Sequence, residues 1–97
     1  MSTYLFSYQA PKGYVPSAEA ADAWSTWFEG LGEVVLDRGN PTFTSDAVGI
    51  SRVDTQLGGY SIIQTASLDK AIEFAKACPI VGAGGGVEVG EITVVDA

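Results

Sequence analysis

Hydrophobic and polar residues alternate along residues 3–9 with the two-residue period of a β-strand. One face of this segment collects three aromatic residues, Tyr4, Phe6 and Tyr8. The opposite face carries Leu5 among small polar residues. Residues 60–65 read Tyr-Ser-Ile-Ile-Gln-Thr, a β-branched and aromatic run that is typical of a strand covered on both faces. The pattern therefore predicts two strands, of which the second lies at the centre of a sheet.

Two other segments place their apolar residues at the three- and four-residue spacing of helices. The first stripe covers residues 20–31 and follows Ser17, which can cap the helix N-terminus. The second covers residues 68–75 and follows Ser67, which can act in the same way. This second helix must end before Pro79, because the residue preceding a proline is pushed out of the helical region.

The remaining segments have weaker patterns. Residues 33–37 predict a short strand that runs into the turn-rich stretch Arg-Gly-Asn-Pro. Residues 42–57 show no sustained period and predict a long loop, with a short strand near residues 48–53. Residues 87–95 predict a last strand whose inward set slips by one residue, which a bulge at Gly90 would explain.

The order strand, helix, strand, strand, helix, strand predicts an α+β fold of the ferredoxin-like βαββαβ type. This fold is an antiparallel four-stranded sheet with two helices on one face, and residues 1–97 are enough for one such domain. The other face of the sheet is left bare, and Leu5 and residues 60–63 put apolar bulk on both faces. We therefore expect a homodimer, a dimeric α/β barrel in which two sheets face each other.

Charge and cysteine usage narrow the partners and the location. Twelve acidic residues against five basic ones give a net charge of −7 and repel a phosphate backbone, so we expect no nucleic-acid partner. Residues 1–8 lack the features of a secretory signal, and no stretch reaches the length of a membrane span. Cys78 is a single cysteine, which fits a reducing compartment. These features predict a cytoplasmic protein without a membrane partner.

Several kinds of chemistry are excluded by the composition. The chain contains no histidine, which removes histidine-based acid/base catalysis and histidine-ligated metal sites. The glycine-rich residues 82–87 lack the dinucleotide-binding pattern and precede a strand instead of a helix. The carboxylates are scattered without the spacing of a calcium loop. We therefore expect neither a metal nor a cofactor.

The candidate ligand site combines polar groups at the turn after the second strand with aromatic rings. Its residues are Asp37, Arg38, Asn40, Arg52, Tyr8, Trp27 and Tyr60. An arginine beside aromatic rings can hold a small carboxylate or a planar ring. The alternative is that Arg38 and Arg52 pair with neighbouring aspartates on the surface, since few cations serve many acids.

Four segments resemble the YCII-related family: residues 57–63, 67–71, 75–79 and 86–89. The first half is similar more weakly, through its aromatic helix and the turn at residues 38–41. The resemblance implies a small dimeric α+β barrel of ferredoxin-like topology, in agreement with the fold that the pattern predicts.

The chain departs from the family where the family's chemistry lies. Members of the catalytic type resemble acid/base enzymes with a histidine in the first helix, paired with an aspartate near the following turn. Residues 20–24 read Ala-Ala-Asp-Ala-Trp instead, and residues 45–49 lack the Asp-Gly-Pro-Phe motif of the other branch. We therefore expect a non-catalytic dimer that binds a small organic ligand or serves as an accessory protein.

The alternative is a small enzyme that uses Asp or Glu with Tyr as acid and base on a small aromatic or carbonyl substrate. A carboxylate with a raised pKa inside a cavity would favour this enzyme.

Overall fold

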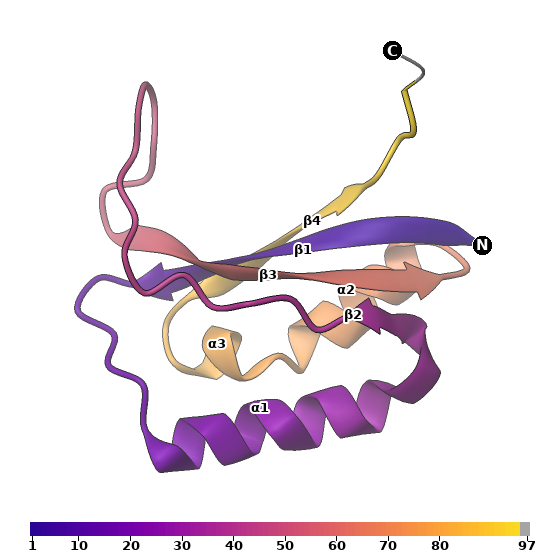
Figure 1. The fold of residues 1–97 in the computed structure, drawn as a ribbon, viewed down its shortest axis with the longest axis horizontal. Coiled ribbons are helices and arrows are strands. Elements are labelled where there is room, and N and C mark those ends of the chain that lie inside the picture. Colours follow the sequence, from indigo (N-terminus) through magenta and orange to yellow (C-terminus); the bar gives the residue numbers. More distant parts are fainter. Residues whose placement is uncertain (96–97) are drawn as a thin grey trace.

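The computed structural model describes residues 1–95 as one sheet with all helices on one of its faces (Figure 1). The elements in chain order are β1 (Ser2–Pro11), α1 (Ala18–Leu31), the 3₁₀ turn η1 (Gly32–Val34), β2 (Val35–Asp37), β3 (Thr55–Thr65), α2 (Leu68–Lys76), α3 (Pro79–Gly82) and β4 (Gly86–Glu91). The strand order is β2-β3-β1-β4, and all neighbouring strands are antiparallel. The predicted α+β, ferredoxin-like fold is confirmed.

The core lies between the sheet and the helices. The aromatic face of β1 points into it, and Tyr4, Phe6 and Tyr8 are all buried. Trp27 of α1 meets this face with its ring 6.3 Å from the ring of Phe6, centroid to centroid. Ala71 of α2 is also buried, and its small side chain suits a helix packed against the sheet. The two-residue period of β1 therefore sets which face carries the helices.

Three details of the predicted elements are wrong. In the described segment 38–54, which connects β2 to β3, the only β-pairing is an isolated bridge from Pro41 to Gly59, and no strand forms near residues 48–53. The last strand ends at Glu91 instead of residue 95. The short helix α3 reaches into residues 81–86, which the glycine-rich sequence predicts to be a flexible connector, and its proline stands at the first helical position, where no backbone N–H is needed.

The prediction of a bulge at Gly90 is also wrong, and the sheet has its bulge in another strand pair. β1 and β4 pair in unbroken register around Gly90. The irregularity lies between β1 and β3, where Tyr8 pairs with Gly59 and Gln9 pairs with Leu57. Gly58 is thus the extra residue, and it bends β3 at the end where the chain approaches α1.

Residues 38–42, which we call the edge segment, extend β2 along β3 without regular strand geometry. The Tyr60 N–H donates to the Asn40 carbonyl over 3.4 Å, and the Thr42 N–H donates to the Gly58 carbonyl over 3.2 Å. Residues 43–54 then leave the sheet on the side opposite the helices (Figure 1). The edge segment is consequently held beside α1 at the border of the sheet.

Among residues 1–95, none of the helices combines the length and the apolar character that a membrane crossing requires.

Candidate functional site

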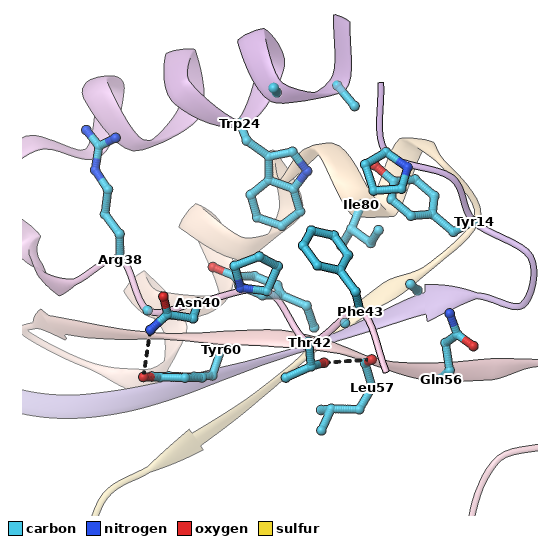
Figure 2. A pocket seen from close by; sticks show the side chains of 18 of the residues that line it. Tyr14, Trp24, Arg38, Asn40, Thr42, Phe43, Gln56, Leu57, Tyr60 and Ile80 are labelled. Atoms are coloured by element: carbon cyan, nitrogen blue, oxygen red, sulfur yellow. Dashed lines mark hydrogen bonds between the residues drawn. The ribbon is translucent and has the colours of Figure 1, made fainter. Parts of the chain in front are cut away.

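A cavity of about 390 Å³ lies between α1 and the edge segment, and the end of the sheet forms its floor (Figure 2). Its lining is mostly apolar and aromatic, and Arg38 and Asn40 lie at one end of it (Figure 2). The main lining side chains are Tyr8, Ala10, Tyr14, Ala20, Ala21, Trp24, Phe28, Arg38, Asn40, Phe43, Tyr60 and Ile80. The volume falls within the range of about 300–1,000 Å³ that is usual for small-molecule sites.

Small residues leave this space open. Ala20 and Ala21 line it from the first turns of α1, while Ala10 and Gly58 line it from the sheet. The start of α1 is fixed by Ser17, whose hydroxyl accepts the Ala20 N–H over 3.1 Å. Two surfaces of small side chains thus face one gap, and no bulky residue fills it.

The aromatic wall of the cavity is pre-arranged by contacts between rings. Trp24 stands edge-on to Tyr8, with ring centroids 4.7 Å apart and planes at 81°. The ring of Phe28, one helical turn further on, lies 5.9 Å from the Trp24 ring, centroid to centroid. Phe43 approaches from the opposite side, although 73% of its surface is exposed. A planar ring that enters would find aromatic surfaces already in place.

Arg38 supplies the positive charge of the cavity. Its guanidinium carbon lies 5.1 Å from the centre of the Phe28 ring, in cation–π geometry. At the sheet edge, the Asn40 side-chain amide donates to the Tyr60 hydroxyl over 3.5 Å, and the Tyr60 ring lies on the face opposite the helices, because Tyr60 pairs with Ser7 (Figure 2). Arg38 thus places charged hydrogen-bond donors at one end of a mostly apolar space (Figure 2).

A buried hydrogen-bond chain runs beneath this polar end. The Tyr8 hydroxyl donates to the Ser61 hydroxyl over 2.7 Å, and Ser61 in turn donates to the Arg38 carbonyl over 2.6 Å. Burial raises the pKa of Tyr8 above its ordinary value, so its hydroxyl is protonated at neutral pH. The proton of Tyr8 is thus committed to Ser61.

The structure brings four of the seven sequence-predicted site residues to the cavity, namely Tyr8, Arg38, Asn40 and Tyr60. Trp27 lies in the core behind the wall, and its indole N–H donates to the Phe74 carbonyl over 3.1 Å. Asp37 caps its own turn by accepting the Gly39 N–H over 2.8 Å. Arg52 forms an exposed ion pair with Glu88 at 2.8 Å, which is the surface pairing expected as the alternative, but with a glutamate.

Sequence reasoning missed several cavity residues. Trp24 and Phe28 lie on the apolar stripe of α1, where packing and ligand contact leave the same pattern. Tyr14 and Phe43 lie in irregular segments that have no period to interpret. Ser61 is an alternating polar position within a strand, and only the fold shows what it contacts.

Carboxylates are absent from this cavity. Among the described residues, no Asp or Glu side chain lines it, and no group of three potential metal ligands occurs. The ionisable groups on its surface are three tyrosines and Arg38. The arrangement can bind a planar ring and a negative charge, but it holds no carboxylic acid for proton transfer.

Comparison with known proteins identifies the family. The YCII-related domain matches residues 1–96, and the chain therefore belongs to the YCII-related family. No curated protein matches the sequence.

One solved structure shares the fold across nearly the whole of both chains. It is the 5-chloro-2-hydroxyhydroquinone dehydrochlorinase TftG from Burkholderia phenoliruptrix AC1100, in complex with 2,5-dihydroxybenzoquinone. The TM-score is 0.69 and the sequence identity is 20%, over 94% of this chain and 93% of the other. This likeness supports the ferredoxin-like architecture.

Proposed function

We propose that this protein binds a small planar aromatic molecule in the cavity beneath α1 and leaves it chemically unchanged. The observation that carries the proposal is the pre-arranged aromatic wall of Tyr8, Trp24 and Phe28 beside a space of about 390 Å³. Stacking on such rings favours a flat ligand, and burial of its apolar surface supplies most of the affinity.

The absence of a proton-transfer group near the ligand supports a binding role. Tyr8 is the most buried tyrosine of the cavity, but its proton is committed to Ser61 and its raised pKa keeps it from acting as a base. The described cavity carries no carboxylate, and the chain has no histidine. The described cavity therefore offers no carboxylate or imidazole for general acid/base catalysis near neutral pH.

The alternative is a small enzyme, and one observation favours it. TftG, which shares the fold, is a dehydrochlorinase that was solved with 2,5-dihydroxybenzoquinone, a flat ring of the kind that this cavity would accept. Since the Tyr8 hydroxyl is bound to Ser61 and the Tyr60 ring lies on the other face of the sheet, catalysis here would depend on Tyr14, which lines the cavity. Turnover of a chlorinated hydroquinone that is lost in Tyr14→Phe would establish the enzyme and overturn the binding role.

The binding role is tested by filling the cavity from α1. Titration calorimetry with 2-naphthamide, a flat neutral bicyclic probe, gives the affinity of the unmodified protein. Ala20→Phe should weaken binding by about tenfold or more, ~1.4 kcal/mol, because the new ring occupies the space of the ligand. Ala23→Phe is the matched control, since Ala23 is exposed on the same helix and does not line the cavity.

Equal affinities in both variants would show that the probe binds elsewhere. Absence of binding by both 2-naphthamide and 2-naphthoate, its carboxylate analogue, to the unmodified protein at millimolar concentration would overturn the proposal.

The assembly and the location belong to the same proposal. We propose a homodimer in the cytoplasm, supported by the sheet face that the helices leave uncovered, which carries Leu5 and Ile62, and by the single cysteine, Cys78, which is buried and free.

A further inference from the structure

We propose that Ser61 is a positioning residue, which fixes Arg38 so that the cavity selects an aromatic acid over a neutral ring of the same shape. This inference rests on the proposed binding function and adds the charge of the ligand and the residue that sets the selectivity.

The Ser61 hydroxyl both accepts and donates a hydrogen bond inside the core. It lies on the helix-facing side of β3 with 0% of its surface exposed. Its oxygen accepts from the Tyr8 hydroxyl, and its single proton goes to the Arg38 carbonyl. Loss of this hydroxyl would leave a phenol and a backbone carbonyl without partners, at a cost of about 1–3 kcal/mol for each buried group. The backbone at Arg38 is therefore tied to the core through a serine and a tyrosine.

The turn that carries Arg38 is also fixed on its other side. Asp37 accepts the Gly39 N–H over 2.8 Å, and Gly39 has a φ of 72°, in the left-handed region. From this anchored backbone the Arg38 side chain reaches toward α1 and stacks on Phe28 (Figure 2). A shift of the backbone would displace the guanidinium by a similar amount, and paired hydrogen bonds tolerate only small displacements.

The charge of Arg38 is available to a ligand. In the part of the chain that the structure describes, the one ion pair joins Arg52 to Glu88, and no carboxylate lines the cavity. A guanidinium offers two parallel N–H donors that match a carboxylate, and such charge-assisted pairs are stronger than neutral hydrogen bonds. Arg38 stacks on Phe28, and Trp24 of the aromatic wall lies one helical turn from Phe28. A carboxylate attached directly to a flat ring can therefore reach the guanidinium while its ring packs on the wall.

The experiment compares 2-naphthoate with 2-naphthamide by titration calorimetry. The ratio of the two dissociation constants isolates the charge, because the probes share their ring system. We expect 2-naphthoate to bind about tenfold more tightly, and Arg38→Gln to bring the ratio close to one. Lys70→Gln is the matched control: Lys70 stacks on Phe74 at 5.2 Å in the same way, but lies away from the cavity.

Ser61→Ala then separates positioning from general stability. If Ser61 positions Arg38, the affinity for 2-naphthoate should fall about fivefold or more while that for 2-naphthamide stays constant. A merely structural role would weaken both probes equally. Ser61→Thr retains a hydroxyl and should restore the ratio.

Ser61→Cys provides the same comparison if Ser61→Ala fails to fold, because it nearly keeps the volume but weakens both hydrogen bonds. An unchanged ratio in the folded Ser61 variant would overturn the positioning role, and so would an unchanged ratio in Arg38→Gln. Binding of neither probe to the unmodified protein would instead overturn the proposed function.

Discussion

Two buried side chains, Cys78 and Tyr8, give the protein a defined response to alkaline pH. Cys78 is 2% exposed, and burial raises the pKa of its thiol from 9.0 to about 12. Burial likewise raises the pKa of Tyr8 above its ordinary value of 10.0. Each group keeps its proton in the folded state at a pH where the unfolded chain has lost it, so folding stability falls as pH rises through that interval.

We expect the free energy of unfolding to be unaffected by these two groups up to about pH 8.5 and then to decrease. The Cys78 contribution should fall by about 1.4 kcal/mol per pH unit between the unfolded and folded pKa values. Urea titrations from pH 7 to pH 11 on the unmodified protein and on Cys78→Ala measure this contribution. Parallel pH profiles for the two proteins would show that the thiol ionises as readily in the folded state as in the unfolded chain.

The identity of the site residues was only partly predictable. The sequence allowed four cavity residues to be grouped, because aromatic rings beside an arginine in a turn suggest a ligand site. They are Tyr8, Arg38, Asn40 and Tyr60. Trp24 and Trp27, however, share one apolar stripe, and the sequence does not show which ring faces the gap and which fills the core. That depends on the distance and rotation of α1 relative to the sheet, which many distant contacts determine together.

At the scale of elements, the regular segments were predictable and the irregular edge was not. β1 and α1 have strong periods and suitable caps, so local pattern and tertiary packing agree. β3 begins at Thr55, earlier than its apolar run, because pairing with the end of β1 gives its polar first residues their backbone hydrogen bonds. The conformation of the edge segment similarly depends on hydrogen bonds to β3, and such long-range contacts leave no pattern in the local sequence.

The fit of the edge segment against β3 depends on Gly39. Its φ of 72° is strained for other residues, and a β-carbon there would collide with the Tyr60 carbonyl. Gly39→Ala should therefore push the edge segment away from β3 and move Arg38 from its place. Gly13 has a similar φ of 82° with nothing within 4 Å of an added β-carbon, so Gly13→Ala is the matched control for strain alone.

We expect Gly13→Ala to cost about 1 kcal/mol in the free energy of unfolding, from the backbone conformation. Gly39→Ala should cost clearly more and should also weaken the binding of 2-naphthoate. Urea denaturation and calorimetry on both variants measure these effects. Equal losses of stability would mean that the edge segment accommodates the extra carbon without moving.

At the scale of the whole molecule, one broad face of the sheet remains uncovered. Leu5 pairs with Ile62, and directly paired residues share a face, so both lie on the side opposite the buried aromatics. Leu5 is 39% exposed. Residues 43–54 and 92–95 stand on this same side (Figure 1), and Val48, Ile50 and Val94 in them are almost fully exposed. The helices cover only the other face.

A second copy of the chain is the occupant that we predict for this face. The molecule measures 36 × 34 × 20 Å, so its broad face is large enough to supply the roughly 800 Å² per partner that a stable interface needs. Leu5→Glu places a charge at the centre of the sheet face and should convert a dimer into a monomer in sedimentation velocity at micromolar concentration.

Leu68→Glu is the matched control, because Leu68 is 45% exposed on α2, on the helix side, and the variant has the same net charge. It should remain a dimer. A monomeric unmodified protein would overturn the prediction, and dissociation by both variants alike would place the interface elsewhere.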